Sequence, residues 1–240
     1  MDYNDRLSDA IRHFWRFRTQ QTTNQGAATG KKDTGNRSAV TGGKHLDGFV
    51  CLLAQILEES GLPKASIHTK ETTLPGFFRP TKNWDVVVVD AGDLVASIEF
   101  KAHIGPSFGN NFNNRVEEAL GNSIDLLTAY REGKFAPSAT PWIGWLMLLE
   151  DCPNSTSPVK VNEPHFKVFE EFNGASYARR YEIFCERLVR ERLYNSACLI
   201  LSDASAGQQG KFTEPNPELS FRRFATSLSA HAMAHARMRS

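Results

Sequence analysis

Two stretches of the chain carry acidic and basic side chains at a spacing that suits metal-assisted chemistry. Glu99 and Lys101 lie two residues apart in the apolar segment 94–101, and Asp85 precedes four consecutive valines at 86–89. If both segments are strands, Glu99 and Lys101 project from one face, roughly 6–7 Å apart, and Phe100 points into a core. The sequence Asp-Ala-Gly-Asp at 90–93 has turn chemistry and predicts that the two strands form a hairpin.

The length of the hairpin loop decides whether Asp85 joins this pair. An odd number of loop residues places Asp85 on the face of Glu99, opposite it or one pair away, and opposite Cβ atoms are about 4.5–5.5 Å apart. An even number places Asp85 on the other face. Two carboxylates that close repel each other unless a cation lies between them, so a shared site requires both an odd loop and a positive charge.

A divalent ion such as Mg²⁺ suits a gap between two carboxylates. Asp85, Glu99, the carbonyl of Phe100 and water would supply its oxygen ligands. Lys101 would stand beside the ion, where it would orient an attacking water or neutralise charge on a phosphate. The alternative is an exposed strand face with a surface ion pair worth about 0–1 kcal/mol. The run of valines favours the site, because it predicts a strand covered on both faces, as in the middle of an α/β sheet.

The elements that would hold these residues alternate between helices and strands. Apolar periodicity predicts helices within 1–17, 44–60 (with Gly61 as its stop), from 113 or 114 to 130, and at 177–194. Strands are expected at 65–70, 86–89, 94–100, 142–149 and 197–201. We therefore expect an α/β fold, with a central mixed sheet flanked by helices, in one domain spanning residues 1–240.

Two segments are expected to lie outside this core. Residues 18–43 are rich in Gln, Thr, Asn, Gly and Ser, which predicts a mobile segment. It is interpreted either as a flexible linker or as an arm that orders against a phosphate backbone. Residues 219–240 carry four arginines and no acid, so we expect a basic C-terminal extension. In the first turn of the helix at 44–60, Asp47 either adds an acid to the metal site or favours the helix dipole.

Two loops could contact a substrate. The loop 74–83 leads directly into Asp85, so Arg79 and Lys82 are candidates for phosphate contact, with solvated loop charges as the alternative. After His103, which we interpret as structural, the chain reads Phe-Gly-Asn-Asn-Phe-Asn-Asn-Arg at 108–115. One asparagine would cap the next helix. Asn110, Asn111, Asn113 and Asn114 exceed that need, and asparagine side chains bind adenine edges and phosphate oxygens.

The helix that follows this block is expected to be amphipathic. Its predicted inward residues are Val116, Ala119, Leu120, Ile124, Leu127 and Tyr130. Its predicted outward residues are Arg115, Glu118, Asn122 and Asp125.

Composition limits the class of protein. The 240 residues are 40% hydrophobic and 23% charged, as in ordinary globular proteins, and no apolar run is long enough for a membrane span. The polar, acidic N-terminus does not resemble a signal peptide, and the four cysteines have no zinc-like spacing. We expect a cytoplasmic protein with reduced core thiols. The net charge of +1 neither supports nor excludes a nucleic-acid partner.

The element order and the positions of Asp85, Glu99 and Lys101 resemble the PD-(D/E)xK nuclease fold, although Asn83-Trp84 replaces the usual proline before the aspartate. A closer resemblance is to the XhoI family of type II restriction endonucleases. It rests on Arg-Pro-Thr-Lys-Asn-Trp-Asp at 79–85, Glu-Phe-Lys at 99–101, the asparagine block at 108–115 and Thr-Ala-Tyr-Arg-Glu-Gly at 128–133. The asparagine block is far more specific than the Asp/Glu-x-Lys pattern.

The resemblance implies a Mg²⁺-dependent homodimer that cuts double-stranded DNA at CTCGAG, after the first C. It implies Asp85, Glu99 and Lys101 as catalytic residues, with Asp85, Glu99 and Phe100 around the metal. Arg79, Lys82, the four asparagines and Arg115 would then bind DNA. Two other functions are also compatible with this sequence. One is a repair or recombination nuclease with structure-dependent cutting, and the other is a DNA-binding or assembly module that needs no Mg²⁺.

Overall fold

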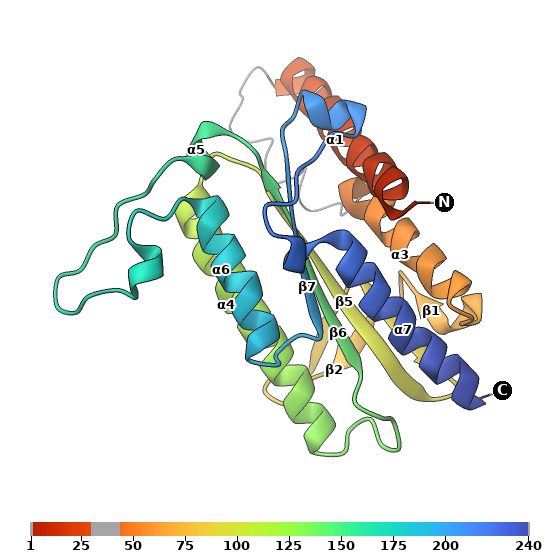
Figure 1. Cartoon of the computed structure of the whole chain (residues 1–240). Helices are drawn as coiled ribbons and strands as arrows, with labels where there is room; N and C mark the ends of the chain where they lie inside the picture. Colours follow the sequence, from red (N-terminus) through yellow and green to blue (C-terminus); the bar gives the residue numbers. More distant parts are fainter. Residues whose placement is uncertain (1, 30–43, 240) are drawn as a thin grey trace.

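A five-stranded mixed sheet forms the centre of the molecule (Figure 1). The computed structural model describes residues 2–29 and 44–239. The strands are β1 (Ile67–His68), β4 (Val86–Asp90), β5 (Asp93–His103), β6 (Trp142–Glu150) and β7 (Ser196–Ser202), in the order β1-β4-β5-β6-β7. Strands β1, β4 and β5 are antiparallel neighbours, whereas β5, β6 and β7 run parallel. The predicted α/β class with a central mixed sheet and flanking helices is confirmed.

Helices cover both faces of this sheet (Figure 1). On one face lie α4 (Phe108–Arg131) and α6 (Tyr177–Arg190), each within a crossover between parallel strands. On the other face lie α1 (Tyr3–Thr29), α3 (Asp47–Glu59) and α7 (Phe221–Arg239). Two apolar clusters result, one on each face of the sheet. This double covering explains the near-continuous apolar sequences of β4, β6 and β7.

Short elements complete the chain. They are the 3₁₀ turns η1 (Lys44–Leu46), η2 (Lys64–Ser66), η3 (Glu170–Phe172), η4 (Ala206–Gln209) and η5 (Pro217–Leu219), the one-turn helix α5 (Pro153–Thr156), and the strands β2 (Thr73–Pro75) and β3 (Thr81–Asn83). No helix in the described part of the chain is long and apolar enough to cross a membrane. All four cysteines are free thiols, and Cys51 is exposed rather than in the core as predicted.

The turn between β4 and β5 contains two residues, which is the even alternative left open by the sequence. Asp90 pairs with Asp93, and both Ala91 and Gly92 adopt positive φ, at 48° and 90°. Such a tight turn matches the twist of adjacent strands. By itself it would place Asp85 on the face opposite Glu99.

A β-bulge in β5 corrects the register. Val89 pairs with Leu94, whereas Val88 pairs with Ala96, so Val95 is an extra residue in β5. Val95 and Ala96 both pack in the cluster beneath α1, α3 and α7. The two-residue loop and the one-residue bulge together shift the register by an odd number, and Val86 therefore pairs with Ile98. Asp85 and Glu99 consequently belong to the same face.

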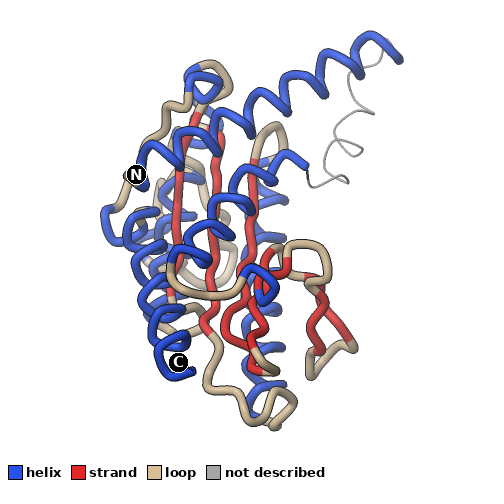
Figure 2. Tube along the Cα trace, turned by 90° about the vertical axis from the view of Figure 1, so that its right-hand side faces the viewer, coloured by secondary structure: helices blue, strands red, loops and turns tan. Residues whose placement is uncertain are grey.

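The structure describes the start of the first peripheral segment and nearly all of the second. Helix α1 continues through the first residues of the segment 18–43, and residues 30–43 lie outside the described residues. Figure 2 shows the end of α1 projecting beyond the sheet. The C-terminal segment is not an extension, because α7 buries Phe221, Phe224 and Leu228 in the core. Its arginines lie on the outer surface of an amphipathic helix, a pattern that their charge had concealed.

The loop predicted at 74–83 is also more ordered than expected. Strands β2 and β3 pair as an antiparallel hairpin, with Leu74 opposite Lys82 and buried against the cluster beneath α4 and α6. This hairpin stands beside the five-stranded sheet rather than within it (Figure 2). Three-residue strands rich in Pro and Thr give little periodicity, so the sequence pattern did not reveal them.

The C-terminal helix should be essential for stability. Phe224 is fully buried against Trp142, with ring centroids 5.1 Å apart. We expect Phe224→Ala to lower the free energy of unfolding by about 3–5 kcal/mol, measured by urea denaturation. Met233→Ala, at an exposed position of the same helix, should change it by less than about 0.5 kcal/mol. Equal stability of the two variants would contradict the packing described for α7.

Candidate active site

Asp85, Glu99 and Lys101 converge on the face of the sheet covered by α4. Glu99 and Lys101 lie in β5 beside Trp145 and Met147 of β6, whose side chains pack in the cluster beneath α4 and α6. Asp85 comes directly before β4, and its alternate neighbour Val87 packs in the same cluster. Phe100 points to the opposite cluster, where its ring contacts that of Phe49, with centroids 5.8 Å apart.

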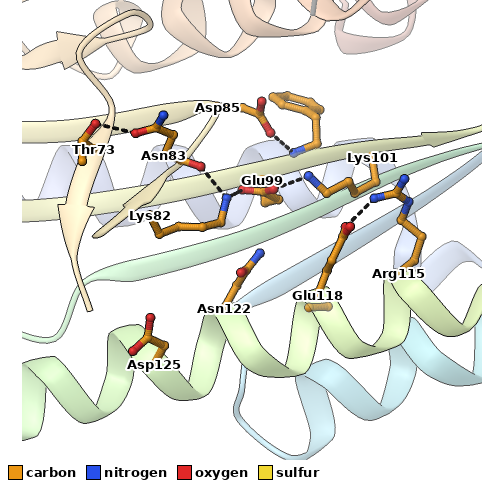
Figure 3. A network of polar contacts seen from close by, with 12 residues as sticks. Thr73, Lys82, Asn83, Asp85, Glu99, Lys101, Arg115, Glu118, Asn122 and Asp125 are labelled. Carbon is orange, nitrogen blue, oxygen red and sulfur yellow. Dashed lines mark hydrogen bonds and ion pairs between the residues drawn. The ribbon is translucent and has the colours of Figure 1, made fainter. Parts of the chain in front are cut away.

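Glu99 is the buried charge at the centre of the site. Its side chain is 3% exposed, and each carboxylate oxygen accepts a hydrogen bond from a lysine (Figure 3). Lys82 of β3 donates to Oε2 at 2.8 Å, and Lys101 donates to Oε1. A carboxylate buried without partners would cost several kcal/mol, so these two lysines allow Glu99 to remain charged inside the fold.

Lys82 also links the hairpin to the site. Its Nζ atom donates to the backbone carbonyl of Asn83 and lies 5.2 Å from the centroid of the Trp84 ring. The side chain is only 17% exposed. Lys82 therefore contacts Glu99, a candidate catalytic residue, and is not a solvated loop lysine.

The Asp85 carboxylate is held against the backbone of β5. Its Oδ2 atom accepts a hydrogen bond of 2.6 Å from the amide of Phe100. Burial raises the pKa of Asp85 to about 6, and the nearby charge of Glu99 acts in the same direction. Lys101, the Phe100 amide and Lys82 oppose this rise in pKa. The two carboxylates therefore repel each other, and a cation bound between them would relieve that repulsion.

Helix α4 supplies polar residues that the sequence assigned to solvent. Figure 3 shows Glu118 and Asn122 pointing from α4 toward Glu99 and Lys101. Glu118 pairs with Arg115, and Asn122 is buried. The predicted outward position of Asn122 and Asp125 is wrong, and so is the inward position of Ile124, which is exposed. The helical periodicity identified the polar stripe but not whether it faces water or a polar site.

Arg79 is anchored to α4. Its Nε atom donates to Asp125 at 2.8 Å, and its Nη2 atom donates to Asn122 at 2.6 Å. The guanidinium is still 41% exposed. Asp125 additionally accepts the backbone amides of Phe77 and Phe78, both at 2.7 Å. These bonds and the Arg79 charge hold the pKa of Asp125 below its usual range, although burial acts in the opposite direction.

The asparagine block belongs to a helix and not to a loop. Helix α4 begins at Phe108, so the predicted start at Asn113 or Asn114 is wrong. Asn110, Asn113 and Asn114 are exposed and Asn111 is partly exposed, and their side chains make no hydrogen bond with the described residues. Arg115, the last residue of the block, instead pairs with Glu118. The asparagines lie in the first two turns of a helix whose later turns face Glu99 and Lys101.

Two residues considered in the sequence are placed away from the reacting groups. His103 is buried, its Nδ1 atom lies 2.8 Å from the hydroxyl of Tyr181, and its ring packs on Phe108. Burial lowers the pKa of His103 to about 4, with the charge of Arg115 acting in the same direction. Asp47 begins α3, on the opposite face of the sheet, so it adds no acid to this site.

The described residues contain no cluster of three or more His, Cys, Asp or Glu side chains that would form a protein-only metal cage. Magnesium is commonly held by one or two carboxylates together with substrate phosphate and water. Asp85 and Glu99, together with the carbonyl of Phe100, which directly follows Glu99 in β5, offer such an incomplete oxygen set. The residues therefore fit a divalent ion that is bound jointly with a phosphate group.

Comparison with known proteins identifies the relatives of this chain. Residues 25–214 match the family model described as restriction endonuclease XhoI.

The chain belongs to the XhoI family of restriction endonucleases.

Three relatives illustrate how far the similarity extends. The type II restriction enzyme BstVI of Geobacillus stearothermophilus is 53% identical over 211 residues, which cover 85% of this chain and 94% of the relative. XhoI of Xanthomonas vasicola is 47% identical over 77% of this chain and 75% of its own length. AbrI of Azospirillum brasilense is 47% identical over 69% and 75%, respectively. No solved structure gives a significant match.

Membership in the XhoI family confirms the resemblance predicted from the motifs. It also confirms the predicted enzyme class, a site-specific deoxyribonuclease. The family match covers β4, β5 and α4 and therefore the whole cluster around Glu99. It stops before α7, which completes the core on the opposite face.

The repulsion between the Asp85 and Glu99 carboxylates should lower the free energy of unfolding at a pH at which Asp85 is charged. The folded pKa of about 6 exceeds the ordinary value of 3.8, so the folded state favours protonated Asp85 and loses this advantage as pH rises through 6. Without divalent metal, we expect Asp85→Asn to be more stable than the wild type by about 1–3 kcal/mol at pH 8. The difference should vanish near pH 4, where the Asp85 side chain is neutral in the folded protein.

Urea denaturation at several pH values tests this expectation. Asp9→Asn, which removes an exposed carboxylate from α1 on the opposite face, is the control for general charge effects. A wild type that is more stable than Asp85→Asn at pH 8 would show that the Asp85 carboxylate is favourably solvated, contrary to the geometry.

Proposed function

We propose that this chain is a type II restriction endonuclease that hydrolyses double-stranded DNA at CTCGAG, after the first C, with Mg²⁺. The observation that supports the proposal most strongly is the convergence of Asp85, Glu99 and Lys101 on one face of a covered sheet, in a chain of the XhoI family. Each strand of the duplex needs one such site. Because the proposed target is a palindrome, two copies of the chain related by a twofold axis would cut both strands.

The residues of the chain have separate roles in this proposal. Asp85 and Glu99 would hold the metal, with the carbonyl of Phe100 as a further ligand. Lys101 lies on Glu99, from where it would orient the attacking water and stabilise charge on the phosphate. Arg79, Lys82 and Arg115 would bind the DNA backbone, and Asn110, Asn111, Asn113 and Asn114 would contact bases or phosphates. Bound Mg²⁺ supplies Lewis acidity to the phosphate and lowers the pKa of a coordinated water.

Asp85 and Lys101 should be required for DNA cleavage but not for DNA binding. We expect Asp85→Ala and Lys101→Ala each to reduce cleavage by at least 10³-fold, on the order of 4 kcal/mol of transition-state stabilisation, and to retain specific binding of an uncut duplex. Lys64→Ala is a matched control, because η2 contacts Asp90 at the distant end of β4 through Ser66. Full cleavage by either site variant would remove that residue from the mechanism.

The target sequence requires a separate assay. Plasmid and phage DNA of known sequence, incubated with the wild type and Mg²⁺, should give discrete fragments whose sequenced ends fall after the first C of CTCGAG. Fragments ending at another fixed sequence would preserve the restriction activity but reject this target. A smear, or cutting only at branched or damaged DNA, would favour the repair or recombination alternative.

Lys82 should oppose metal binding in the absence of DNA, because it occupies one oxygen of Glu99. We expect Lys82→Met to bind Mn²⁺ several-fold more tightly than the wild type without DNA, measured by calorimetry or by the electron spin resonance of free Mn²⁺. Asp85→Asn should weaken this binding in either background. Weaker Mn²⁺ binding by Lys82→Met would show that Lys82 organises the ligands rather than competing with the ion.

A further inference from the structure

The tip of the β2–β3 hairpin carries two exposed aromatic side chains. Phe77 is 52% exposed and Phe78 is 70% exposed, and their rings meet edge to face with centroids 5.0 Å apart. We call these two residues the aromatic tip. Leaving a phenylalanine side chain in water forgoes about 1.5–3 kcal/mol relative to burying it. Two neighbouring exposed rings therefore suggest a surface that another molecule covers.

The backbone of the aromatic tip is hydrogen-bonded to α4. Asp125 of α4 accepts the amides of both Phe77 and Phe78, and the same carboxylate pairs with Arg79. A Cβ atom at Gly76 would lie 2.2 Å from Asp125 Oδ2, so only glycine allows the hairpin to approach α4 this closely. These contacts fix the backbone on both sides of the tip. The exposure of the rings is therefore a built feature of the hairpin and not the result of a loose loop.

Charge around the tip indicates which partner would cover it. The hairpin, from Thr73 to Asn83, contains the cations Arg79 and Lys82 and no acid, and each cation pairs with a carboxylate of a neighbouring element, Asp125 or Glu99. Arg79 keeps 41% of its side chain exposed beside the rings. Lys82, in the stem of the same hairpin, contacts Glu99. An apolar tip flanked by cations and connected to the catalytic cluster matches the surface of a nucleic acid, with phosphates for the cations and bases for the rings.

We propose that the aromatic tip inserts against the bases of the bound duplex beside the cleaved phosphate and partly unstacks one base step. The inference rests on the proposed function and extends it, since it names a contact that none of the family motifs includes. Phe78 is the more exposed ring and is expected to make the principal contact. Arg79 and Lys82 would hold the adjacent phosphates and thereby fix the depth of insertion.

Fluorescence of 2-aminopurine tests this contact directly. A duplex with the mapped cleavage site, carrying 2-aminopurine at each step in turn, is bound by the enzyme with Ca²⁺ in place of Mg²⁺ to prevent cutting. The wild type should increase the fluorescence at one step beside the cleaved phosphate several-fold. The double variant Phe77→Ala/Phe78→Ala should abolish that increase and lower kcat/KM by tenfold or more. Phe78→Leu should retain part of both effects.

The control is Phe166→Ala, which removes a phenylalanine that is 89% exposed in another segment and should change neither quantity. Urea denaturation and light scattering of the same proteins report folding and subunit number. An unchanged fluorescence signal in the double variant would overturn the proposal, and so would a loss of dimer with the signal intact, which would make the tip a subunit contact. A wild type that cuts no DNA would remove the proposed function together with the tip contact. A cutting wild type beside an unaffected double variant would remove the tip contact alone.

Discussion

The charge of Glu99, buried on the central strand of an apolar sheet, is the constraint on which the rest of the site depends. A carboxylate with 3% of its side chain exposed is stable only if both oxygens are bonded. The fold meets that demand with Lys101 from the same strand and Lys82 from a separate hairpin. This arrangement leaves Asp85 as the unbalanced group, with a pKa raised by burial and by Glu99. The site thus combines Glu99, whose two oxygens are both hydrogen-bonded, with Asp85, whose charged form is disfavoured. This combination suits a cation that binds together with a substrate.

The position of Asp85 depends on one extra residue in β5. With a two-residue turn and no bulge, Asp85 and Glu99 would lie on opposite faces of the sheet, one under α4 and the other under α1 and α3. The extra residue Val95 shifts the pairing of β4 and β5 by one position, and this shift places Asp85 on the same face as Glu99. The site therefore depends on a backbone irregularity as well as on three side chains. The bulge is itself held in place, because both Val95 and Ala96 are buried in the core.

Sequence reasoning could predict the strands, the crossover helix α4 and the shared face of Glu99 and Lys101, because these follow from long apolar patterns and two-residue alternation. It left the face of Asp85 open, because that face depended on the unknown loop length, and nothing in the apolar pattern revealed the bulge at Val95. It also missed the roles of Asn122 and Asp125. A polar stripe on an amphipathic helix has the same pattern whether it faces water or a second polar surface. The same ambiguity concealed α7, whose arginines drew attention away from Phe221, Phe224 and Leu228.

The β2–β3 hairpin connects two buried carboxylates, Asp125 of α4 and Glu99 of β5. Its tip is bonded to Asp125 of α4, and its stem is bonded to Glu99 of β5 through Lys82. Each anchor is a buried carboxylate that loses favourable partners if the hairpin moves. A molecule that binds the tip or its cations therefore acts on groups that also determine the charge around Glu99. Because Lys82 and an incoming metal ion would share one carboxylate oxygen, a phosphate that attracts Lys82 would also free a ligand for the ion, so substrate and metal would favour each other's binding.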